Sequence, residues 1–132
     1  MLKTKSILAP KENSDGLRIS IMSRHTLNDG TTPDSRITRL SYNLWERILA
    51  PPEDLLGDYY KRSLPWKKFE KRYLEYLRQP DIQIKVQNIA ETGLGNSLIT
   101  LLCVEDSPEK CHRRLLAEEC KRYQPELVLD IK

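Results

Sequence analysis

The pattern that most constrains the fold lies in the last third of the chain, where a strand, a helix and a second strand follow closely. Residues 97–104, SLITLLCV, form an apolar run without polar alternation, as in a strand covered on both faces. Ser107, Pro108 and Glu109 supply an N-cap and an acidic first turn, which predicts a helix from Pro108 to about Tyr123. Residues 126–131, ELVLDI, are typical of a final strand. This order indicates a parallel unit with a right-handed crossover.

Two further strands are predicted near the start of the chain. Residues 4–9 and 17–23 are rich in strand-forming residues, and Asn13 to Gly16 between them supply turn chemistry. Residues 24–38 that follow have many turn formers and no sustained periodicity, so they are predicted to form a long loop. Loops of that length within a compact domain are usually functional or mobile.

The middle of the chain is predicted to be helical. Residues 43–50 favour one or two helical turns that stop at Pro51 and Pro52, and a further helix can begin at Pro52. Residues 65–78 carry their large apolar side chains at the spacing of one helix face, namely Trp66, Phe69, Tyr73, Tyr76 and Leu77. Residues 81–90 fit both a helix and a strand; the helix is preferred, with an end at Gly93 or Gly95. The sum is a small α/β domain, a mostly parallel sheet flanked by helices, spanning residues 1–132.

Composition excludes several classes of protein. A chain of 132 residues with 39% hydrophobic and 31% charged residues suits one folded domain, and no apolar run approaches the about 20 residues that a membrane helix requires. The start of the chain lacks the pattern of a secretory signal, and three cysteines are an odd number for a disulfide framework. We therefore expect a cytoplasmic protein with reduced thiols and no membrane partner. The net charge of +3 permits anionic partners without requiring them.

A binding site is expected at the carboxyl ends of the strands, where ligands of open parallel sheets are bound. Cys103 lies near one strand end, and Arg24 directly follows another. The helix predicted from Pro108 would direct unpaired main-chain N–H groups toward the same region. On that helix Cys111 and His112 are expected to face inward, whereas Arg113 would project toward the flank and the solvent.

These residues resemble a known family. Cys103 and Glu105, followed by Cys111, His112 and Arg113, resemble the signature of domain-of-unknown-function family 488. The resemblance extends over most of the chain, through the segments SDGLRISIMSR, PDSRI and WKKFEKRYLEYL. Short members of the family usually carry an Asp-Arg pair before a Pro-Arg-Gly turn, where this chain has Ser23, Arg24 and His25 and then Asn28, Asp29 and Gly30. The resemblance implies an α/β fold and no particular activity or cofactor.

Cys103 has three interpretations. The first is a buried residue that ends a strand, which is the commonest role of a free cysteine. The second is a nucleophile whose pKa is lowered by the nearby helix N-terminus, His112 and the arginines, although spacing alone assigns it no base and orienting group. Glu105 and His112 act as acid and base only in the anion interpretation below, on the bound ligand. The Cys-x5-Arg loop of thiol phosphatases is absent, because the sixth residue after Cys103 is Glu109.

The third interpretation is a metal site made by Cys103, Cys111 and His112 with Glu105 or His25. The usual pairs of ligands two to four residues apart are missing. Adjacent helical residues such as Cys111 and His112 diverge by about 100 degrees, which is awkward for one ion. No bound metal is therefore predicted.

The favoured interpretation is a site for a small anion, with Arg24, Arg36 and Arg113 as ligands and Cys111 in its inner wall, because the planar guanidinium suits phosphate and carboxylate. It predicts an uncharacterised protein with a phosphate-like or nucleotide-like ligand and leaves open whether it is an enzyme. The rival is a nucleic-acid-binding or structural protein that uses the basic face of helix 65–78, with Lys67 and Lys68. That rival requires exposed aromatic rings, whereas the helical spacing directs them inward.

Overall fold

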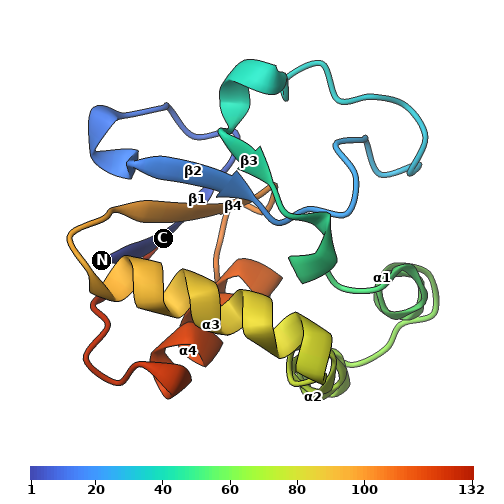
Figure 1. Ribbon diagram of the computed structural model, residues 1–132. Helices are drawn as coiled ribbons and strands as arrows, with labels where there is room; N and C mark the ends of the chain where they lie inside the picture. Colours follow the sequence, from blue (N-terminus) through green and yellow to red (C-terminus); the bar gives the residue numbers. More distant parts are fainter.

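The computed structural model describes residues 1–132 and contains five strands and four α-helices (Figure 1). The strands are β1 (Leu2–Ser6), β2 (Leu17–Ser20), β3 (Leu44–Trp45), β4 (Ile99–Cys103) and β5 (Leu129–Ile131). Their order in the sheet is β3-β2-β4-β1-β5, and every neighbouring pair is parallel. The helices are α1 (Glu53–Lys61), α2 (Trp66–Leu77), α3 (Pro80–Leu94) and α4 (His112–Tyr123). The predicted α/β fold with a parallel sheet is confirmed.

Strand β4 occupies the centre of the sheet. It pairs with β1 on one side, where Leu2 aligns with Ile99, and with β2 on the other, where Leu17 aligns with Ile99. All five of its residues are buried. The continuous apolar run that predicted this strand therefore reflects neighbours on both edges and cover on both faces.

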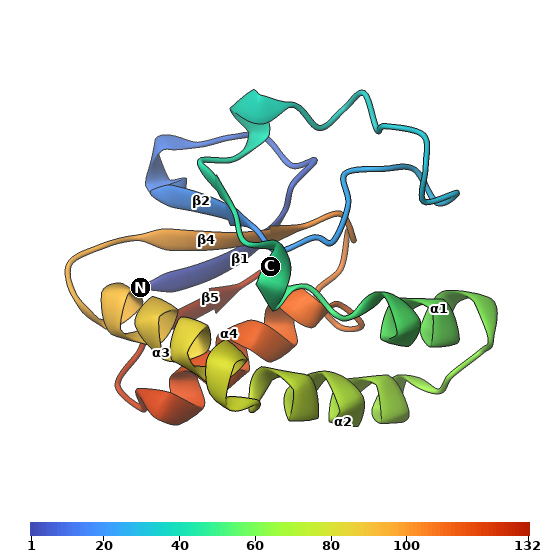
Figure 2. The same ribbon diagram turned by 45° about the vertical axis from the view of Figure 1, so that its right-hand side comes forward.

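The two faces of the sheet are covered differently. Helices α2, α3 and α4 lie on one face, and the segments 7–16 and 21–43 lie over the other, as both views show (Figures 1 and 2). The chain runs from β1 outward through β2 to β3 and then returns to β4 and β5. Right-handed crossovers place connections that run in opposite directions on opposite faces. The carboxyl end of β4 is therefore a topological switch point, since its own connection leaves toward the helices and those of β1 and β2 leave toward the loops.

The helical face carries the larger core. Phe69, Tyr73 and Leu77 of α2 are buried there, together with Val86 of α3. Residues 81–90 are helical, and the helix is capped at Gly95. The aromatic side chains of α2 pack on this core, so they form no row of exposed rings on which bases could stack. No helix in the chain has the length and apolar character needed to cross a membrane.

Residues 43–50 differ from the prediction of helical turns. Leu44 and Trp45 form strand β3 beside β2, and only Arg47–Leu49 form a short 3-10 turn. Main-chain hydrogen bonds from Asn43 N to Arg18 O, 2.8 Å, and from Glu46 N to Ser20 O, 2.9 Å, hold this segment on the sheet edge. Pairing with β2 therefore outweighs the local helical pattern.

Helix α4 also begins later than predicted, at His112 and not at Pro108. Ser107 caps only a local turn, in which its Oγ accepts a hydrogen bond from Glu109 N at 3.3 Å. Cys111 is the N-cap and has an extended backbone, with φ −136° and ψ 139°. This conformation places Cys111 in a small apolar cluster with Cys103, Ile7, Met22, Ile37 and Leu102.

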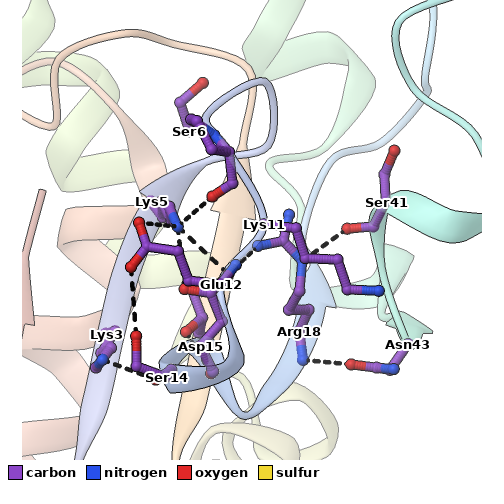
Figure 3. Close-up of polar contacts among 12 residues, drawn as sticks. Lys3, Lys5, Ser6, Lys11, Glu12, Ser14, Asp15, Arg18, Ser41 and Asn43 are labelled. Carbon is purple, nitrogen blue, oxygen red and sulfur yellow. Dashed lines mark hydrogen bonds and ion pairs between the residues drawn. The ribbon is translucent and has the colours of Figure 1, made fainter.

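The loop-covered face of the sheet is polar (Figure 3). Asp15 accepts hydrogen bonds from Lys5 at 3.0 Å and from Arg18, and both Asp15 and Arg18 are buried. The turn that carries Asp15 lies tightly against the start of β4. Gly16 has φ +65°, and a Cβ atom there would lie 2.2 Å from Leu98 O, so this position requires glycine.

Replacing Asp15 by Asn is predicted to lower the free energy of unfolding by about 3–5 kcal/mol, because Arg18 would remain buried without its counter-charge. Burial raises the pKa of the Asp15 carboxyl, but hydrogen bonds from the Glu12 main chain, Lys5 and Arg18 outweigh it and hold the pKa below its usual value. The wild-type contribution is therefore present above the unfolded-state pKa and is lost as the pH falls through the lower folded-state value. Urea unfolding measures the change.

The matched control is Asp54→Asn. Asp54 makes an exposed ion pair with Arg72 at 3.6 Å, so its removal should cost at most about 1 kcal/mol. Equal losses in the two variants would contradict the role given to the buried pair.

Candidate functional site

Cys103 is the last residue of β4 and lies at the switch point of the sheet. Its carbonyl accepts a hydrogen bond from Ile7 N, just after β1, at 2.8 Å. Its side chain is 3% exposed and belongs to the cluster that contains Cys111 and Ile37. Ile37 comes from the loop 24–38, so that loop folds back over the strand ends.

His112, the first residue of α4, lies beside Cys103. Its Nε2 is 2.7 Å from the carbonyl oxygen of Ile21, and its Nδ1 is 3.7 Å from Cys103 Sγ. Because a carbonyl oxygen only accepts hydrogen bonds, Nε2 carries the proton in this arrangement and Nδ1 is left as the acceptor. The unprotonated Nδ1 therefore faces the Cys103 thiol.

The electrostatics of the two neighbouring thiols are opposite. A hydrogen bond from Cys111 lowers the pKa of Cys103, burial opposes that shift, and the Glu105 main-chain N–H and the charge of Arg113 add to it. The same hydrogen bond, together with burial, raises the pKa of Cys111 well above its usual value. Negative charge is therefore favoured on Cys103, with Cys111 as its proton donor.

Arg113 is fully buried, which corrects the expectation that it projects toward solvent. Its Nε donates to Lys132 O at 3.1 Å, and its Nη1 donates to Glu105 O at 2.7 Å and to Cys111 Sγ at 3.3 Å. These acceptors satisfy a guanidinium that would otherwise be costly to bury. Arg113 thus ties the loop after β4 to the last residue of the chain and places positive charge beside the thiols.

The prediction that Cys111 and His112 diverge is also wrong. Cys103 Sγ, Cys111 Sγ and His112 Nδ1 all lie within 4.8 Å of one another. They converge because Cys111 is the extended N-cap and not a helical residue. Two thiols and an imidazole whose other nitrogen is fixed by a carbonyl are a donor set that suits zinc. Here, however, the guanidinium of Arg113 already supplies positive charge to this set.

Glu105 is placed by helix α1. The hydroxyl of Tyr60 donates to Glu105 Oε1 at 2.9 Å, which joins α1 to the loop after β4. Neither Glu105 nor His25 belongs to the close set of sulfur and nitrogen atoms.

Arg24 and Arg36 each have a carboxylate partner. Arg24 pairs with Glu53 of α1 and donates to Gly30 O at 2.9 Å. Arg36 makes two hydrogen bonds to Asp34, at 3.0 and 2.8 Å. Both side chains remain exposed, 46% for Arg24 and 61% for Arg36. The structure therefore gathers Cys103, Cys111, His112 and Arg113 at one strand end. It leaves Arg24 paired with Glu53 of α1 and Arg36 paired with Asp34.

The contacts of the second histidine, His25, were not predicted from the sequence. Ser20 Oγ lies 2.7 Å from His25 Nε2, and the His25 ring stacks on Trp45 at 3.9 Å. Burial and the charge of Arg47 lower the pKa of His25, so its neutral form is favoured. Its stacking partner Trp45 belongs to β3, a segment that was predicted to form helical turns. The only sequence signal for this contact is a histidine two residues after the predicted strand 17–23.

Comparison with known proteins gives one match. The family model DUF488-N3a, described as the active DUF488-N3 subclade, matches residues 2–124. No curated protein matches the chain, and no solved structure does. The matched segment contains the carboxyl ends of β2 and β4. It also contains the whole region from Cys103 to Arg113, on which the resemblance rests. The chain therefore belongs to domain-of-unknown-function family 488.

Proposed function

We propose that this protein is an enzyme that uses Cys103 as a nucleophile on a small anionic molecule, phosphorylated or nucleotide-like. The observation that carries the proposal is the contact between Cys103 Sγ and His112 Nδ1, with the other imidazole nitrogen bound to the Ile21 carbonyl. Nucleophile, base and orienting group are the three parts of an activated thiol. The matched family model is described as an active subclade, which supports an enzyme without naming a reaction.

The chemistry follows from the positions of the protons. The Cys103 thiol proton passes to His112 Nδ1, and the sulfur forms a bond to the electrophilic atom of the substrate. The leaving group departs with the electron pair of the broken bond and takes the proton from His112. Water then attacks the same atom and gives a proton to His112 Nδ1, the bond to sulfur breaks with its electron pair returning to Cys103, and His112 returns the proton to the sulfur. The charge of Arg113 and the thiol of Cys111 stabilise the thiolate at the start and at the end of the cycle.

The proposed anion ligands are Arg24 and Arg36. Both are exposed in the loop 24–38, whose Ile37 packs in the Cys103 cluster. An anionic substrate that displaces Ile37 would reach the thiol and could take over guanidinium donors now bound to Glu53 and Asp34. Glu105, which is held by Tyr60 in the loop after β4, is the proposed second acid–base group. Arg113 has a positioning role in this proposal, because main-chain carbonyls and Cys111 occupy its donors.

The first test is thiol reactivity. Iodoacetamide is expected to modify Cys103 before the other two cysteines, since its pKa is lowered whereas burial and the charge of Glu119 raise the pKa of Cys120 to about 12. The rate should fall as the pH drops through the lowered pKa of Cys103. Peptide mass spectrometry over a pH series measures the rate at each site.

His112→Gln should slow modification of Cys103 near neutral pH by at least about tenfold, because the thiol loses the group that accepts its proton. His25→Gln is the matched control and should leave the rate unchanged. Preferential modification of Cys120, or equal effects of the two histidine variants, would contradict the assignment.

The second test is metal content. Because Arg113 neutralises the thiol set, protein purified without chelator is expected to hold less than about a tenth of an equivalent of zinc by elemental analysis. If the wild type held one equivalent of zinc and Cys103→Ser held none, Cys103 would be a metal ligand and the nucleophile assignment would be wrong.

The third test is turnover. A panel of phosphorylated and nucleotide-like molecules is incubated with the protein, and products and Cys103 adducts are followed by mass spectrometry. Cys103→Ser should abolish turnover, and the Arg24→Ala, Arg36→Ala double variant should lower kcat/KM by at least about tenfold for an anionic substrate. Cys120→Ala is the control and should retain activity. Turnover that survives in Cys103→Ser would exclude the mechanism.

A further inference from the structure

We propose that a second site, a hollow on the loop-covered face of the sheet, binds a small organic phosphate. The hollow has a volume of about 530 Å³, which is within the usual range for small-ligand pockets. It opens between the segment after β1 and the segment 36–41, over strand β2. We call it the Arg18 hollow, after the residue at its base. It is lined by three cations, Lys11, Arg18 and Arg36, and by the apolar side chains of Ile7, Leu8 and Leu40.

Arg18 supplies a donor that the protein leaves free. The residue is 2% exposed; its Nε donates to Ser41 O at 2.9 Å, and its Nη1 pairs with Asp15 (Figure 3). Its Nη2 has no partner among the protein hydrogen bonds. No fully buried side-chain nitrogen lacks a partner, so Nη2 must reach solvent, and Arg18 lines this hollow. A guanidinium that is fixed by other hydrogen bonds and keeps one N–H group free can bind an anion without moving.

Lys11 adds a charge that no carboxylate balances. Its Nζ makes a long hydrogen bond, 3.4 Å, to Leu40 O across the hollow, and it forms no ion pair. Arg36 keeps its Nη1 free while Nε and Nη2 bind Asp34. The lining of the hollow contains these three cations and no carboxylate. Three cationic groups with free donors suit a phosphate.

The apolar lining indicates that the ligand has an apolar part. Leu40 is 81% exposed at the rim, and Ile7 and Leu8 lie across from it in the lining. An exposed leucine beside open cationic donors can cover an aromatic or aliphatic group whose phosphate reaches Arg18 and Lys11. Burial of that group would add affinity beyond that of inorganic phosphate.

The proposal does not depend on thiol chemistry. Ile7 connects the two regions, since it lines the hollow and its N–H bonds Cys103 O at 2.8 Å. The two sites otherwise share only Arg36, so the test leaves Arg36 and the buried Arg18 unchanged. Lys11 and Leu40 are exposed and can be replaced without disturbing the core.

The experiment is isothermal titration calorimetry with phenyl phosphate, inorganic phosphate and benzoate at constant ionic strength. Phenyl phosphate is expected to bind about tenfold more tightly than inorganic phosphate, because its ring is covered by the apolar lining. Lys11→Glu should weaken phenyl phosphate binding by at least about tenfold. Leu40→Ala should bring its affinity close to that of inorganic phosphate. Lys67→Glu, on the exposed side of α2, is the charge-matched control and should have no effect.

The failure of this proposal is distinguishable from that of the enzyme proposal. Cys103→Ser should bind phenyl phosphate as the wild type does, even if it has no activity. Absence of binding, equal weakening by Lys67→Glu, or loss of binding in Cys103→Ser would overturn the assignment to the Arg18 hollow. Binding of benzoate as tight as that of phenyl phosphate would overturn the assignment of a phosphate ligand.

Discussion

The parallel pairing of β4 with both β1 and β2 is the constraint on which the rest of the structure depends. It buries every residue of β4 and forces the chain to leave the sheet at Cys103 toward the helices, while the two neighbouring strands lead to loops on the other face. Main-chain groups of three strand ends are thereby gathered around one thiol. The Ile21 carbonyl orients His112, and the Ile7 N–H fixes the Cys103 carbonyl. The contact between Cys103 and His112 therefore depends on the strand order of the sheet.

The delayed start of helix α4 completes the site. If the helix began at Pro108, Cys111 would lie on a helical turn and would diverge from His112. Because Cys111 is extended, its Sγ lies within 4.8 Å of Cys103 Sγ. Arg113 enters the interior, where Lys132, Glu105 and Cys111 accept its hydrogen bonds. A buried guanidinium beside two thiols favours one negative charge among them. This arrangement is the electrostatic basis of the proposal that Cys103 is an activated thiol.

Sequence patterns predict the parts of this fold that depend on local periodicity or composition. The apolar run of β4 and the aromatic face of α2 are of that kind, and so is the proximity of Cys103 to the Cys111–His112 pair across a short connection. Strand β3 cannot be predicted in this way, because its two residues are extended only through pairing with the free edge of β2. The burial of Arg113 depends on the last residue of the chain, and the partners of Arg24 and Arg36 depend on a loop without periodicity. The Arg18 hollow forms between two such segments, so no single stretch of sequence predicts it.

The central claim is that His112 faces Cys103 as a base, and the nitrogen NMR spectrum of His112 at neutral pH tests it most directly. The account predicts that Nε2 carries the proton, that Nδ1 does not, and that Cys103→Ser changes the chemical shift of Nδ1 while Cys120→Ala leaves it unchanged. A proton on Nδ1 of the neutral ring, or a Nδ1 shift indifferent to Cys103, would contradict the account.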